Sequence, residues 1–66
     1  MKVTLYSTNC PKCHVLEKKL ANKKIDFNVI TDEDIMLKKG FMSAPMLEVD
    51  GNVMDFKEGN IWINQF

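Results

Sequence analysis

The two cysteines of this chain, Cys10 and Cys13, lie three positions apart at the junction between two segments of different periodicity. Residues 2–6 alternate polar and apolar side chains, which predicts a short β-strand. From Pro11 onward, apolar side chains recur at helical spacing, and proline is well suited to the first position of a helix. The feature that most constrains the fold is therefore a strand and a turn leading into a helix that begins at a cysteine pair.

The rest of the chain continues to alternate between strand and helix patterns. Thr31, followed three residues later by Asp34, has the pattern of a helix N-cap, and Gly40 is a typical signal for the end of that helix. Asp50-Gly51 predicts a tight hairpin turn. The predicted strands are 2–6, 25–30, 46–49 and 52–55, and the predicted helices are 11–24, 32–39 and 61–66.

This order of elements, β-α-β-α-β-β-α, defines the predicted fold class. The first strand–helix–strand unit implies two parallel strands joined by a right-handed crossover, and the final hairpin is antiparallel. A chain of 66 residues can build only one small core, so we expect a single domain over 1–66. The prediction is an α/β domain with a mixed four-stranded sheet covered by helices.

The charge balance argues against polyanionic partners. Nine basic residues, all of them lysine, balance nine acidic ones. A neutral chain without arginine lacks the side chain that usually binds phosphates in bidentate geometry, so we expect no nucleic-acid partner. No apolar run is long enough to cross a membrane, and the first residues have no signal-peptide pattern. We therefore expect a cytoplasmic protein that does not bind membranes.

The spacing of the cysteines favours a redox-active pair over a structural disulfide. The loop between them closes only four residues, for which a disulfide would contribute roughly 2 kcal/mol. We expect Cys10 to cap the helix and face solvent, and Cys13 to occupy the third helical position and point toward the sheet. The helix N-terminus and the charge of Lys12 would favour a thiolate at Cys10. Cys10 is then the predicted nucleophile, and Cys13 would resolve the mixed disulfide.

Three other interpretations of this motif stay open. Two buried, inert cysteines are possible, and Cys10, Cys13 and His14 together also match the pattern of c-type haem attachment. Haem attachment needs export, for which the sequence has no signal. The same three residues could begin a zinc site, but a structural zinc ion usually takes four ligands. We predict no metal, and a redox-inactive or zinc-binding module remains the alternative.

Two stretches of the sequence carry a resemblance to a known family. Residues 5–13, Leu-Tyr-Ser-Thr-Asn-Cys-Pro-Lys-Cys, are similar to the strand and C-x-x-C opening of glutaredoxins. Residues 40–45, Gly-Phe-Met-Ser-Ala-Pro, resemble the loop that precedes the cis-proline of that family. The resemblance spans nearly the whole chain. It implies a glutaredoxin-like member of the thioredoxin superfamily, with the minimal thioredoxin fold and thiol–disulfide oxidoreductase activity.

The resemblance also implies roles for individual residues. The Ala44–Pro45 peptide bond should be cis and lie beside Cys10, and the backbone next to it should align the substrate as a short added strand. Pro11 and Lys12 would tune the thiolate. The implied substrate surface consists of Thr8, Asn9, Ala44 and Pro45.

The electron source is the point at which this sequence departs from many glutaredoxins. Those that use glutathione usually have a lysine just before the motif and a Gly-Gly after the last strand, and residues 7–9 and 54–58 have neither. Residues 40–41 and 56–61 are more similar to NrdH-type redoxins, which take electrons from thioredoxin reductase and reduce ribonucleotide reductase.

The resemblance therefore implies a monomeric electron carrier in cellular redox homeostasis, with no bound cofactor. Its electrons would come from NADPH through thioredoxin reductase, and its partner would be a disulfide-containing protein, with ribonucleotide reductase as one candidate. The alternative is a glutathione-dependent glutaredoxin.

Overall fold

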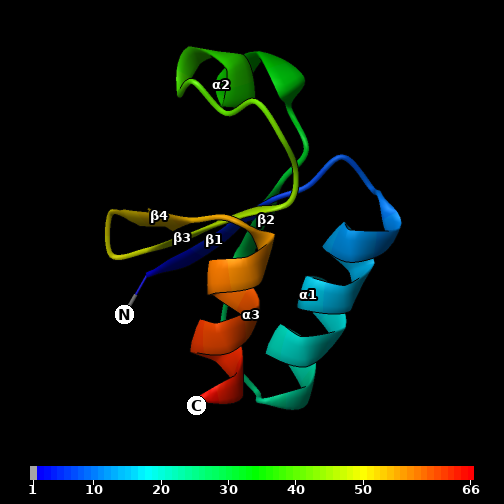
Figure 1. The fold of residues 1–66 in the computed structure, drawn as a ribbon, viewed down its shortest axis with the longest axis vertical. Coiled ribbons are helices and arrows are strands. Elements are labelled where there is room, and N and C mark those ends of the chain that lie inside the picture. Colours follow the sequence, from blue (N-terminus) through cyan, green and yellow to red (C-terminus); the bar gives the residue numbers. More distant parts are fainter. Residues whose placement is uncertain (1) are drawn as a thin grey trace.

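A computed structural model describes residues 2–66 and contains the predicted order of elements (Figure 1). None of the helices among these residues has both the length and the apolar composition needed to cross a membrane. The elements are β1 (Val3–Tyr6), α1 (Pro11–Asn22), β2 (Asn28–Ile30), α2 (Glu33–Lys38), β3 (Met46–Val49), β4 (Asn52–Met54) and α3 (Phe56–Asn64).

The four strands form one mixed sheet in the order β2-β1-β3-β4. β1 pairs in parallel with β2, with Leu5 opposite Val29, and antiparallel with β3, with Leu5 opposite Leu47. β4 returns antiparallel along β3. The predicted four-stranded α/β fold is confirmed, and it places the end of β1, from which the cysteine loop leaves, in the middle of the sheet.

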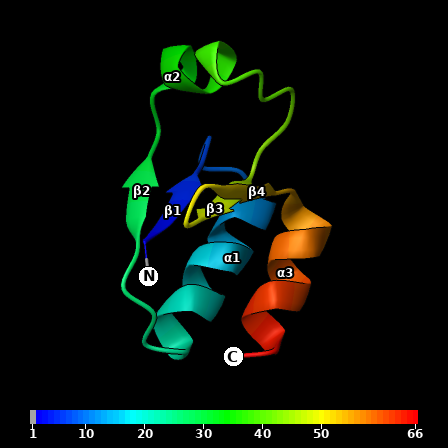
Figure 2. The ribbon, with the colours of Figure 1, turned by 90° about the vertical axis from the view of Figure 1, so that its left-hand side faces the viewer.

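The helices are divided between the two sides of the sheet. α1 and α3 lie side by side against one face, whereas α2 stands apart on the other side of the strands (Figures 1 and 2). The core lies between the sheet and the α1–α3 pair, with Phe27, Met54, Phe56 and Trp62 packed at its margin. Its buried members are Val3, Leu5, Leu16, Leu20, Ile25, Leu47, Val49 and Ile63.

The turn residues behave as their sequence patterns predict. Gly40 follows α2 with φ +80° and Gly51 closes the β3–β4 hairpin with φ +88°, both in the region that glycine adopts readily. Asp50, the other central residue of the hairpin turn, has φ +49°. Two successive residues with positive φ are what a type I′ hairpin turn requires.

Several boundaries differ from the prediction, and three of these differences have a clear local reason. The N-cap of α2 is Asp32 instead of Thr31, and its carboxylate accepts the N–H of Asp34 at 2.9 Å. β2 begins at Asn28 rather than at residue 25, because only residues 28–30 of the predicted strand pair with β1. α3 starts at Phe56, five residues earlier than predicted. Its N-cap is Asp55, whose carboxylate accepts the N–H of Glu58 at 2.8 Å.

Truncation of Leu47 is expected to lower the free energy of unfolding by about 2–5 kcal/mol. This side chain is fully buried on β3, and a Cβ on Gly59 of α3 would lie only 3.4 Å from it. A domain of this size has a stability of roughly 3–10 kcal/mol, so Leu47→Ala removes a large share of it. Urea unfolding followed by circular dichroism measures the change.

Leu37→Ala is the matched control, because it deletes the same atoms from a side chain that is 71% exposed. Its free energy of unfolding should stay within about 0.5 kcal/mol of the parent protein. Equal losses in the two variants would contradict the assignment of Leu47 to the core.

Candidate functional site

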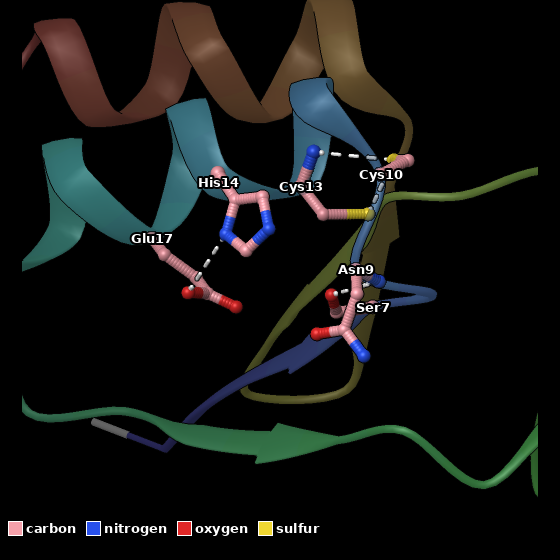
Figure 3. A network of polar contacts seen from close by, with 6 residues as sticks. All are labelled: Ser7, Asn9, Cys10, Cys13, His14 and Glu17. Carbon is pink, nitrogen blue, oxygen red and sulfur yellow. Dashed lines mark hydrogen bonds and ion pairs between the residues drawn. The ribbon is translucent and has the colours of Figure 1, made fainter.

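The two cysteines lie where the chain leaves β1 and enters α1 (Figure 3). Cys10 is the N-cap, with extended backbone angles of φ −78° and ψ 164°, and Pro11 is the first helical residue. Cys13 is the third, and its backbone N–H donates to the Cys10 Sγ at 3.3 Å. The predicted placement of both cysteines is confirmed.

The two sulfurs face each other but differ in access to solvent. Their Sγ atoms are 2.6 Å apart, and both cysteines are free thiols. Cys10 is partly exposed, whereas Cys13 is 0% exposed and points toward the sheet. An external disulfide can therefore reach Cys10 but not Cys13.

Burial and hydrogen bonding have opposite effects on the pKa of the Cys13 thiol. Burial raises the pKa of the Cys13 thiol, since a thiolate loses hydration there. Hydrogen bonds from the side chains of Cys10 and Ser7, and from the backbone of Thr8 and Cys10, lower that pKa and outweigh the effect of burial. As a result, the pKa of Cys13 lies below its ordinary value, and the thiolate form of this buried sulfur is favoured.

The loop before β3 completes the site on the side of Cys10. The Ala44–Pro45 peptide bond is cis, as the resemblance implied, and Pro45 is fully buried. The Ala44 carbonyl oxygen lies 3.9 Å from the Cys10 Sγ. Residues 34 positions apart in the sequence thus meet at the exposed sulfur.

Two shallow hollows share Ser43 and Ala44 in their linings. One, of about 340 Å³, lies toward α2 and is lined by Thr8 and by the large apolar side chains of Met36, Leu37, Phe41 and Met42. The other, of about 280 Å³, lies toward α3 and is lined by Lys12, Pro45, Asp55, Phe56 and Lys57. Ala44, whose carbonyl oxygen lies near the Cys10 Sγ, therefore borders both a largely apolar hollow and a hollow that contains two lysines.

Not every predicted site residue contacts the sulfurs. The Lys12 ammonium lies over the ring of Phe56, 5.4 Å from its centroid, so any effect on a thiolate acts through space. Asn9 is exposed and shapes the loop through its backbone, with φ +63°. The roles assigned to Pro11 and Lys12 in tuning, and to Thr8 and Asn9 in substrate binding, stay predictions.

His14 belongs to the solvent face of α1. Its Nδ1 lies 3.7 Å from Glu17 Oε2, one helical turn along, and the ring points away from the sulfurs (Figure 3). Over the described range, 2–66, no three His, Cys, Asp or Glu side chains gather closely enough to hold a metal ion.

One buried residue near the sulfurs has no clear signal in the sequence. Ser7 is 0% exposed, and its Oγ accepts the N–H of Asn9 at 3.0 Å (Figure 3). A serine in a polar stretch at the end of a strand is typical of an exposed turn, so the pattern alone did not single it out. The one available hint was Asn9, because asparagine is favoured where a non-glycine residue must adopt positive φ.

Comparison with known proteins agrees with this geometry. No model of a known protein family matches the sequence. The thioredoxin of Methanothermobacter thermautotrophicus is 36% identical over 59 residues, which cover 80% of this chain and 77% of that protein. The solved structure of Escherichia coli NrdH-redoxin, described as glutaredoxin-like, superposes with a TM-score of 0.77 and covers 100% of this chain and 95% of its own, at 20% identity.

The structural match shows a shared fold, and the sequence match shows the family. Both agree with a pair of thiols at the start of α1, beside a cis-proline. The chain therefore belongs to the thioredoxin superfamily of thiol–disulfide oxidoreductases, in the compact glutaredoxin-like form of its fold.

Proposed function

We propose that the chain is a dithiol electron donor that reduces disulfides in partner proteins, with Cys10 as the nucleophile and Cys13 as the resolving residue. The observation that carries the proposal is the difference in burial between two sulfurs only 2.6 Å apart. One sulfur is accessible to a partner, and the other is accessible only to its neighbour. This division suits a two-step exchange in which each cysteine acts once.

The reaction proceeds by two thiolate attacks. In the first, the Cys10 thiolate attacks one sulfur of the substrate disulfide. A mixed disulfide forms, and the other substrate sulfur leaves as a thiolate. In the second, the Cys13 thiolate attacks the Cys10 Sγ. This step closes the Cys10–Cys13 disulfide and releases the remaining substrate thiolate. Two electrons pass from the dithiol to the substrate, and a reductase returns them from NADPH.

The surface around Cys10 suits an extended segment of a partner protein. The backbone of Ala44 lies beside the sulfur, and an extended peptide can add to such a backbone as a short strand. The two hollows that share Ala44 then provide room for side chains that flank the substrate cysteine. Thr8, Ala44 and Pro45 would contact this segment directly.

We propose thioredoxin reductase, in preference to glutathione, as the source of electrons. The chain lacks the lysine and the Gly-Gly that glutathione-using glutaredoxins usually have. After β4 the backbone passes directly into α3, and the Asp55 carboxylate is engaged in capping that helix. The structural neighbour is described as having a thioredoxin-like activity profile, which supports the same choice. By similarity to NrdH-type redoxins, ribonucleotide reductase is a candidate electron acceptor.

An electron-source assay tests this proposal. The oxidised protein is mixed with NADPH and thioredoxin reductase, and separately with NADPH, glutathione and glutathione reductase. We expect NADPH consumption at least about tenfold faster with thioredoxin reductase, because the chain lacks recognition groups for glutathione. Insulin, whose disulfides are reducible, serves as a general acceptor that sustains turnover.

Each other outcome has a distinct meaning. Reduction by glutathione alone would replace the proposed donor and make the protein a glutaredoxin with a divergent binding site. No reduction by either system, with the Cys10–Cys13 disulfide intact at the start, would overturn the proposed function. A parallel assay with Cys10→Ser measures the background consumption of NADPH.

A further inference from the structure

The smaller of the two hollows brings together two lysines from different helices. α1 and α3 lie side by side and begin at the same end of the helix pair (Figure 1). Lys12 lies in the first turn of α1 and Lys57 in the first turn of α3, and both are exposed. They line this hollow together with Ala44 and Pro45. Two cations therefore lie beside the backbone to which a partner segment would add.

The positive charge of this hollow is not neutralised from within the chain. Among the residues that the structure describes, neither Lys12 nor Lys57 takes part in an ion pair. Asp55 also lines the hollow, but its carboxylate accepts the N–H of Glu58 at 2.8 Å and caps α3. The Lys12 ammonium lies 5.4 Å from the centroid of the Phe56 ring, and this contact orients it without using all three of its N–H donors. Two lysines and one aspartate leave the hollow with a net positive charge.

We propose that Lys12 and Lys57 select partner segments that carry an acidic side chain close to the substrate cysteine. This inference rests on the proposed function and names the class of protein disulfide that it favours. The Ala44 carbonyl oxygen lies 3.9 Å from the Cys10 Sγ, so the hollow begins next to the reacting sulfurs. An extended segment advances about 3.3 Å per residue, which places the acidic side chain within about two residues of the substrate cysteine.

The lysines act on the first of the two exchange steps. The Cys10 thiolate attacks the sulfur of the segment's cysteine, the disulfide of the segment breaks, and its other sulfur leaves with the electron pair. The two ammonium groups bind the segment and not the reacting sulfurs, so they favour acidic segments over neutral ones. One exposed ion pair changes an equilibrium by about 1.5- to 5-fold, and two lysines should therefore give a preference of about three- to tenfold at low salt.

The test compares two peptides in the Cys13→Ser variant, in which only the first step can occur. Each peptide has one cysteine, joined as a mixed disulfide to the thiolate half of Ellman's reagent, an aromatic disulfide. Attack by Cys10 on the peptide sulfur releases the coloured thiolate, which stopped-flow absorbance follows. One peptide has glutamate on both sides of its cysteine, and the other has glutamine at the same positions. Reaction with 2-mercaptoethanol corrects for the intrinsic reactivity of each peptide.

The result is the ratio of the two corrected rates, in which any effect of Lys12 on the ionisation of Cys10 cancels. We expect a ratio of about three to ten at low ionic strength, and below about two in 1 M salt, where the screening length is only about 3 Å. Lys57→Gln should lower the ratio, and Lys12→Gln together with Lys57→Gln should bring it close to one. Lys18→Gln is the matched control and should leave it unchanged, because Lys18 is exposed on α1 but lines neither hollow.

A ratio near one before either lysine is replaced would overturn the proposal, as would a ratio that the double replacement leaves unchanged. Glutathione also has carboxylates near its sulfur, so its mixed disulfide with the same coloured thiolate is tested as the other source of this chemistry. A corrected rate equal to that of the acidic peptide would overturn the assignment of the hollow to a protein segment. Failure of Cys10 to react with either peptide would instead contradict the proposed function.

Discussion

Replacement of Cys10 by serine is expected to reduce the rate of disulfide reduction by roughly a thousandfold or more. The variant loses the nucleophile, and a serine hydroxyl is not ionised at neutral pH. The remaining thiol, Cys13, is fully buried and cannot substitute for it. The measurement is the rate of insulin reduction with thioredoxin reductase and NADPH, compared with the parent protein at equal concentration.

The position of Cys10 makes this variant unusually easy to interpret. Cys10 is the N-cap of α1, and serine is among the residues that cap helices best. The substitution should therefore leave the free energy of unfolding unchanged or slightly higher, which urea unfolding can verify. Activity above about a tenth of the parent value in a folded variant would contradict the assignment of Cys10 as nucleophile.

The cysteine geometry was predictable because it depends on local rules. Alternation in residues 2–6, a proline at position 11 and helical spacing after it place Cys10 at a helix N-cap. Once that register is set, the third helical position brings Cys13 back toward Cys10 and the sheet. The order of the strands in the sheet was equally predictable, because a right-handed crossover and a two-residue hairpin leave few alternatives for four strands.

The start of α3 was missed although a local signal for it exists. Asp55 and Glu58 have the spacing of a capping pair, with an acidic side chain at the N-cap and another in the first turn. The prediction relied on the apolar residues from Ile61 onward and overlooked this pair. Gly59 also weakens the helical pattern in the sequence. In the structure, this glycine allows α3 to pack closely against Leu47 and Leu16.

Other features could not be predicted from local pattern at all. The extent of β2 depends on how much of residues 25–30 lies opposite β1, which is a tertiary property. The cis Ala44–Pro45 bond was expected only through the family resemblance, because an X-Pro bond chosen at random is cis in only about 5% of cases. Ser7 is fully buried and its Oγ accepts the N–H of Asn9, although its place in a polar stretch at the end of a strand is typical of an exposed turn.

The second large effect is expected from Cys13→Ser, which should trap the mixed disulfide instead of preventing its formation. Cys10 and its surroundings remain, so the first attack on Ellman's reagent proceeds and releases one coloured thiolate. The second thiolate is not released, because no resolving thiol lies within reach of the Cys10 Sγ. Intact mass spectrometry should show one covalent adduct per chain, and turnover with insulin should fall about a hundredfold or more.

Cys10→Ser and Cys13→Ser are each other's control, because each variant keeps one thiol in an otherwise similar site. A simple loss of reactivity would affect the two in the same way. The difference in burial predicts opposite results: an adduct at Cys10 when Cys13 is replaced, and almost none at Cys13 when Cys10 is replaced. An adduct in Cys10→Ser that forms as fast as the one in Cys13→Ser would show that the loop over Cys13 opens readily. Access could then no longer decide which cysteine attacks first, and the order of the two steps would have to follow from the ionisation of the two thiols.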